Sequence, residues 1–112
     1  SHGNLDSVRT WADVRDAVRA YYKMFSHGRV GEAYNVGGNY VKTIGEMLDY
    51  LISLSPMKDK IRKQLDSKLV RTVDVNLQIV DTSKFQRDVS WVPEISFEKI
   101  MQDLLNWWRE NV

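Results

Sequence analysis

The chain has 112 residues, which is enough for one small domain or for a piece of a larger one. Hydrophobic residues make up 43% and charged residues 28%, the balance of a folded globular protein rather than of a disordered one. The formal net charge is +1, which argues against a nucleic-acid or membrane-surface protein because binding to phosphate backbones needs a concentrated basic face. A core of this size is thin, so we expect apolar surface that is meant for a neighbour.

The residue types also exclude several kinds of site. The chain has no cysteine and only two histidines, His2 and His27, so we expect no disulfide and no metal site. No stretch approaches the roughly 18 apolar residues of a membrane span, and no signal sequence opens the chain. A cytoplasmic protein is therefore the default expectation.

The first part of the chain predicts an extended segment followed by a helix. Residues 4–11 mix polar and apolar residues without a helical period, which favours an extended conformation. From Asp13 to about Phe25 the apolar residues recur at helical spacing, and Arg15, Asp16, Arg19 and Lys23 lie on the opposite face. This pattern predicts a one-sided helix, and a turn follows it at Ser26-His27-Gly28.

The middle of the chain predicts a short strand and a second helix. Residues 32–36 form a brief strand-like run that Gly37-Gly38-Asn39 closes as a turn. Thr43 and Glu46 have the spacing of a capping box, in which each side chain satisfies a backbone donor of the first helical turn. The helix that starts there has an apolar stripe that we expect to be buried, formed by Ile44, Met47, Leu48, Leu51 and Ile52.

The last part predicts one strand and two helices. Between Val73 and Ile79 apolar residues alternate strictly with polar ones, which indicates a strand. Residues 81–84 are typical of the start of a short helix, and residues 91–93 of its exit. The third long helix starts near Ser96 and runs through Trp108. The chain is therefore expected to be one helix-rich α/β unit, residues 1–112, with strands too few and too short for a doubly wound sheet of its own.

The chain shows no catalytic residues and no cofactor site of its own. Neither histidine lies in a pattern that suggests a nucleophile–base pair. Gly28 and Gly31 have part of the spacing of a dinucleotide fingerprint, but Tyr34 stands where its third glycine would fall. No tyrosine is followed four residues later by lysine, so the proton-transfer pair of short-chain dehydrogenases is also missing.

Four segments together resemble the carboxyl half of the extended short-chain dehydrogenase/reductase family. Residues 3–16, which begin Gly3-Asn4-Leu5-Asp6, are similar to the Gly-Asn-Leu-Asp…Arg-Asp/Thr-aromatic…Val-x-Asp segment of GDP-mannose 4,6-dehydratases and GDP-4-keto-6-deoxymannose reductases. Residues 32–47 resemble the family's Tyr-Asn-Ile/Leu-Gly strand and the helix after it. Residues 69–75 resemble its Arg-Pro-x-Asp/Glu-Val loop, and residues 81–108 its Asp-x-Ser-Lys…Gly-Trp-x-Pro…Phe…Trp segment. Two positions depart from these patterns, since Thr72 replaces the usual proline and Ser90 the usual glycine.

The resemblance implies that this chain is the nucleotide-sugar-binding, C-terminal domain of a lyase. The intact protein would bind NADP or NAD in an N-terminal Rossmann domain upstream of residue 1. Hydride transfer at C4 of a GDP-mannose-like substrate would open a dehydration to a 4-keto-6-deoxy sugar. The parent would then be an enzyme, whereas this part alone would not. Expected partners are the nucleotide sugar and the Rossmann domain, with a homodimer left open.

The resemblance also implies the substrate-binding residues. The arginines that match Arg9 and Arg71 hold the diphosphate, as a guanidinium can with paired phosphate oxygens; without the resemblance, each would be interpreted as a solvated surface charge. Asp74 matches an acidic residue that bonds the ribose or orients the loop, and an exposed aspartate of a strand is the alternative interpretation. Asn4 either contacts the nucleoside or pairs with neighbouring backbone.

Other interpretations stay open. A GDP-4-keto-6-deoxymannose reductase and a UDP- or dTDP-sugar epimerase or dehydratase would share these segments. A binding or interaction domain that has lost the enzyme is the alternative from another class. Trp91, Trp107 and Trp108 could stack on a base, but core positions or a seam with the missing domain are the more frequent roles of such residues.

Overall fold

The computed structural model describes residues 1–112 and has a three-stranded sheet with four α-helices. In chain order the elements are β1 (Val8–Trp11), α1 (Val14–His27), β2 (Tyr40–Thr43), α2 (Ile44–Ser53), β3 (Leu77–Gln78), α3 (Ser83–Val89) and α4 (Phe97–Asn111). Two single 3-10 turns, Lys58–Lys60 and Ser67–Leu69, lie between α2 and β3. The helix-rich α/β class predicted from the sequence is confirmed.

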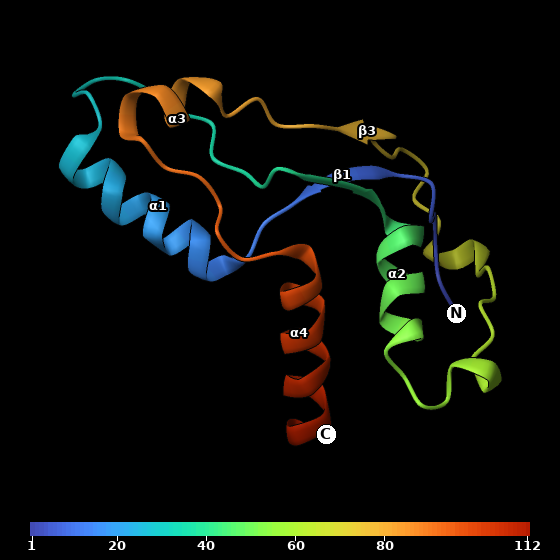
Figure 1. Ribbon diagram of the computed structural model, residues 1–112. Coiled ribbons are helices and arrows are strands. Elements are labelled where there is room, and N and C mark those ends of the chain that lie inside the picture. The colour runs from blue at the N-terminus through green and yellow to red at the C-terminus, as the bar shows by residue number, and fades with distance from the viewer.

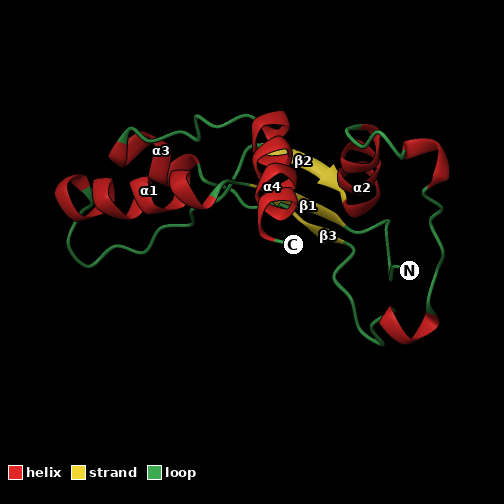
Figure 2. Cartoon of the chain, turned by 90° about the horizontal axis from the view of Figure 1, so that it is seen from below, coloured by secondary structure: helices red, strands yellow, loops and turns green.

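The sheet has the order β2-β1-β3, with β1 antiparallel to β2 and parallel to β3. Helices α1 and α3 pack together at one end of the molecule, while α2 and α4 contact each other and project from the same face of the sheet (Figure 1). Seen from below, α4 lies between the α1–α3 pair and α2 (Figure 2). The molecule is elongated and flat, 52 × 35 × 20 Å.

The helix starts are set by local hydrogen bonds. Asp13 accepts from the backbone N–H of Arg15 at the start of α1, at 2.8 Å. At α2, the Glu46 N–H donates to Thr43 Oγ1 at 2.9 Å and the Thr43 N–H donates to Glu46 Oε2 at 2.7 Å, which is the predicted capping box. Ser96 caps α4 in the same way. The three predicted long helices are therefore confirmed, although His27, expected in a turn, is the last residue of α1.

The strand predicted over residues 32–36 is wrong, because β2 follows it at Tyr40–Thr43 and pairs with all of β1. Gly38 explains the placement. A Cβ on Gly38 would lie 1.5 Å from the carbonyl oxygen of Trp11, so only glycine lets the chain pass the end of β1 and enter the sheet after the turn. Tyr34 and Val36 pack against the core between α1 and α3 instead of pairing.

The strand predicted over residues 73–79 is confirmed only at Leu77–Gln78, which pair with Val8 and Arg9. Its four apolar side chains, Val73, Val75, Leu77 and Ile79, are all exposed. The alternation is present in the sequence, but only two residues of this segment pair with β1. No other part of the chain covers its apolar side chains.

The main core lies between α1 and α3 and consists of Ala20, Phe85, Val89 and Trp91. Trp91 is thus a core residue, and its ring packs against Phe85 with centroids 5.5 Å apart. Ser90, just before it, has φ 53° and ψ 44°. The turn therefore keeps the left-handed conformation for which glycine is preferred, even though serine occupies the position.

Much of the apolar surface is uncovered, as the short length predicts. The expected buried stripe of α2 is only half-buried. On α4, Trp107 and Trp108 are exposed. On α1 the apolar stripe faces outward, formed by Val14, Val18, Tyr21, Tyr22 and Phe25. Separately, none of the helices has the length and apolar character to span a membrane.

Candidate functional site

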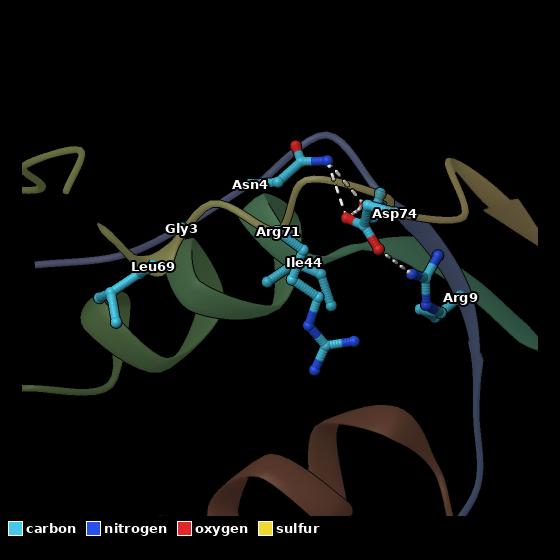
Figure 3. Close-up of a pocket in the computed structure, with 8 residues that line it drawn as sticks. Gly3, Asn4, Arg9, Ile44, Leu69, Arg71 and Asp74 are labelled. Carbon is cyan, nitrogen blue, oxygen red and sulfur yellow. Dashed lines mark hydrogen bonds and ion pairs between the residues drawn. The ribbon is translucent and has the colours of Figure 1, made fainter. Parts of the chain in front are cut away.

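The four residues predicted to bind substrate line one pocket of about 270 Å³ at the start of β1. Asn4 and Arg9 come from the N-terminal segment, and Arg71 and Asp74 from the loop before β3 (Figure 3). The remaining lining residues are Gly3, Ser7, Ile44 and Leu69. Because β1 and β3 are parallel neighbours, the segments that lead into both strands meet at the same end of the sheet, where the two strands begin.

Asp74 is held by three donors. Its Oδ2 accepts from Ser7 Oγ at 2.8 Å and from Asn4 Nδ2 at 3.1 Å, and its Oδ1 lies 3.3 Å from Nη2 of Arg9. The hydrogen bonds from Ser7 and Asn4, together with the charge of Arg9, lower the pKa of Asp74 below its ordinary value. Asp74 is therefore a carboxylate whose oxygens are engaged within the protein.

Arg9 is anchored at both terminal nitrogens of its guanidinium. Nη1 donates to the carbonyl oxygen of Val8 at 2.8 Å, and Nη2 donates to Asp74. The side chain is largely shielded, with 22% exposed. A guanidinium has five N–H donors, so Arg9 keeps donors for a further acceptor in the pocket.

Arg71 is exposed and makes no hydrogen bond or ion pair with any residue of the chain. In Figure 3 its side chain extends away from Asp74 into the open part of the pocket. The charged residues of the lining are two guanidinium groups and one carboxylate. The pocket therefore carries a net positive charge, with one arginine unpaired, and suits an anionic ligand with several oxygens.

Ser7 is the residue that the sequence prediction missed. It is 2% exposed and lies two positions before Arg9. Residues two apart in an extended segment face the same side, so the extended pattern of residues 4–11 was a usable signal. Asp13 is the N-cap residue of α1 and Asp16 lies in its first turn, where negative charge is favoured. No group of three or more His, Cys, Asp or Glu side chains could hold a metal ion.

A protein-family model for GDP-mannose 4,6 dehydratase matches residues 1–104. The chain belongs to this family, within the extended short-chain dehydrogenase/reductases.

Individual relatives agree with the family. A dTDP-glucose 4,6-dehydratase of Escherichia coli is 33% identical over 98% of this chain and 33% of its own length. The Haemophilus influenzae enzyme of the same name is 31% identical, with 98% and 35% covered. The chain thus spans about a third of the curated relatives that it matches.

Solved structures show the same fold. The dTDP-glucose 4,6-dehydratase of Bacillus anthracis in complex with NAD matches with a TM-score of 0.80 and 29% identity, covering 98% of this chain and 34% of that one. RMD from Pseudomonas aeruginosa, complexed with NADPH, has a TM-score of 0.83 at 24% identity, with 98% and 35% covered. At 24% identity, the similarity to RMD is evidence for a shared fold only.

Proposed function

We propose that this chain is the nucleotide-sugar-binding part of an NAD(P)-dependent sugar-nucleotide 4,6-dehydratase, in which Arg9 and Arg71 hold the diphosphate. One observation carries the proposal: two guanidinium groups from distant parts of the sequence converge on one pocket, and one of them has no partner. Guanidinium groups stay charged and bind paired phosphate oxygens through parallel N–H donors. Gripping the nucleotide, which does not react, positions the sugar that does.

The adjacent glycines of this chain do not form the phosphate cradle of a dinucleotide cofactor. The only adjacent glycines, Gly37 and Gly38, follow an irregular segment rather than a strand, and Gly38 is packed against the backbone of Trp11. Their amides therefore form no open phosphate cradle before a helix. We therefore assign the cofactor, the catalytic residues and the dehydration to the part of the relatives that this chain does not span.

We assign the substrate to the GDP-sugars, GDP-mannose above all. The assignment is supported by the Gly3-Asn4-Leu5-Asp6 stretch and by the family match over residues 1–104. A dTDP-sugar is the second candidate, because dTDP-glucose 4,6-dehydratases are among the curated relatives at 33% and 31% identity. Both substrates carry the same diphosphate, so the role of the two arginines does not depend on the choice.

The partner of this chain is the cofactor-binding part of the same protein, which we propose covers the outward apolar stripe of α1. The stripe contains two tyrosines and Phe25, which is 93% exposed. Burial of such a face is favourable by about 25 cal/mol per Å² of apolar surface. The relatives are about three times as long as this chain, so most of their length is available to cover it.

A nucleotide titration of the ¹⁵N-labelled chain by NMR tests the proposal, with GDP, GDP-mannose, UDP and dTDP at matched concentrations. With most of the site's protein surroundings missing, a dissociation constant of about 1 mM is expected, equivalent to roughly 4 kcal/mol. The shifted signals should belong to residues 3–9 and 69–74 and should respond most strongly to the guanine nucleotides. Arg71→Gln should abolish the shifts, while Arg62→Gln, an exposed arginine outside the pocket, should leave them unchanged.

The other outcomes separate the parts of the proposal. Equal responses to all four nucleotides would leave the diphosphate site in place and remove the GDP assignment. A dispersed spectrum that responds to no nucleotide would contradict binding by this chain and favour an interaction domain.

A further inference from the structure

Ser7 is the only buried residue among those that line the pocket. Its hydroxyl donates to Asp74 Oδ2 at 2.8 Å, and its carbonyl oxygen accepts from the backbone N–H of Ile44 at 3.0 Å. Ser7 therefore joins three parts of the structure: the start of β1, the start of α2 and the loop before β3. A hydroxyl buried in this way is fixed in direction, because it has no water with which to exchange its hydrogen bonds.

Asn4 uses both ends of its amide inside the protein. Its Nδ2 donates to Ser7 Oγ at 2.9 Å and to Asp74 Oδ2 at 3.1 Å. Its Oδ1 accepts from the backbone N–H of Asp6 at 2.9 Å, the bond of an Asx turn. Both hydrogens of the amide nitrogen can be used in these contacts, and the oxygen already accepts one hydrogen bond within the chain.

Asp74 connects this pair to Arg9. Two donors fix Oδ2, so the carboxylate can rotate little, and its Oδ1 is directed at Nη2 of Arg9. Together with the bond from Nη1 to the Val8 carbonyl, this contact anchors both terminal nitrogens and sets the plane of the guanidinium. Arg71 lacks any such support.

We infer that Ser7 and Asn4 are positioning residues that hold the Asp74 carboxylate as the anchor of the Arg9 guanidinium. Asp74 and Asn4 then act through Arg9 instead of touching the nucleoside. The role of Arg9 in binding a phosphate rests on the proposed function, whereas the hydrogen bonds that hold its guanidinium do not. An arginine that is already in place loses less side-chain freedom when a phosphate binds, which corresponds to about fivefold tighter binding.

The test compares Ser7→Ala with Ser7→Thr and with Ser53→Ala, the same change at an exposed serine at the end of α2. Two quantities are measured by NMR on the ligand-free chain: the pKa of Asp74, from its carboxyl carbon, and the mobility of the Arg9 Nε–H group. Ser7→Ala should raise the pKa of Asp74 towards its ordinary value and increase the mobility of Arg9. Ser7→Thr, which keeps the hydroxyl, should restore both, and Ser53→Ala should change neither. Asn4→Ala, at a half-buried position, should also raise the pKa of Asp74 and the mobility of Arg9. It replaces Ser7→Ala in the test if that substitution unfolds the chain.

Binding measurements complete the test. Ser7→Ala should weaken GDP binding about fivefold, and Asn4→Ala should leave the ratio between GDP and 2′-deoxy-GDP unchanged. An unchanged Asp74 pKa and unchanged Arg9 mobility in a folded Ser7→Ala chain would overturn the inference. So would a loss, in Asn4→Ala, of the preference for GDP over 2′-deoxy-GDP. If the unsubstituted chain bound no nucleotide, the proposed function would fail, while the two ligand-free measurements would still decide the positioning role.

Discussion

Asp16 on α1 accepts a hydrogen bond from the backbone N–H of Ile95, 79 positions later in the chain, at 3.0 Å. The same oxygen accepts from the N–H of Glu94, and the other oxygen accepts from Arg19 at 2.8 Å. Asp16 is 2% exposed. The face of α1 that carries Asp16 and Ala20 therefore packs inward. The apolar stripe of Val14, Val18, Tyr21, Tyr22 and Phe25 points outward.

Replacing Asp16 should destabilise the chain more than an ordinary surface change. Asp16→Ala removes the acceptor of two backbone N–H groups and the partner of Arg19, and hydrogen bonds to a charged group contribute about 1.5–3 kcal/mol. We expect the free energy of unfolding in urea to fall by about 2 kcal/mol. Asp59→Ala, at an exposed aspartate, is the control, and equal effects of the two substitutions would contradict the inward packing.

The outward apolar face of α1 should be nearly neutral for stability. Val18→Ser with Phe25→Ser changes two exposed side chains, so the free energy of unfolding should move by less than about 0.5 kcal/mol for each. Ala20→Leu, at a fully buried position of the same helix, should instead cost about 1–3 kcal/mol through overpacking. In sedimentation experiments, the double serine variant should associate less with itself than the unsubstituted chain does. A large loss of stability in the double variant would show that the face is covered within the chain.

Ser90→Gly should stabilise the chain. Ser90 has φ 53° and ends α3 in the left-handed conformation, which costs a non-glycine residue about 1 kcal/mol. We expect a gain approaching 1 kcal/mol in urea unfolding, reduced by the greater freedom of glycine in the unfolded chain. Ser53→Gly, in the last turn of α2, should have the opposite sign, a loss of about 0.5–1 kcal/mol. A loss of stability at both positions would contradict the assigned conformation.

Acid should destabilise the folded chain. The Arg15 side chain lowers the pKa of Asp13, Ser7 that of Asp74, and Lys99 that of Asp103, all from an ordinary value of 3.8. The unfolded chain therefore takes up protons at higher pH than the folded chain does. The contribution of these carboxylates to the free energy of unfolding is complete above about pH 5 and falls as the pH drops below about 4. It is lost once the pH is below their pKa values in the folded chain. Urea midpoints at pH 7, 5, 4 and 3 measure it, and a midpoint that rises between pH 4 and 3 would contradict the direction.

The features that the sequence predicts correctly depend on residues close together along the chain. The starts of α1, α2 and α4 follow from Asp13, the Thr43–Glu46 pair and Ser96, because each cap closes its hydrogen bond within three residues. The family follows from four segments in their usual order, and the pocket residues Arg9 and Arg71 come from two of them. All of this is information that a linear pattern can carry.

Tertiary structure alone decides which segments pair and which faces are covered. Residues 32–36 have a strand-like composition, yet Tyr40–Thr43 form the strand because Gly38 fits against Trp11. The stripe on α1 predicts a helix but not the direction of its apolar face, which depends on Asp16 reaching two amides near residue 95. Ser7 acquires its role only where residues 4–9 meet the loop at Asp74. By itself the sequence determined the helices, their caps and the family, because those depend on local spacing. The strand partners, the exposed face and the anchoring of Arg9 depend on contacts between residues that the chain brings together only when it folds.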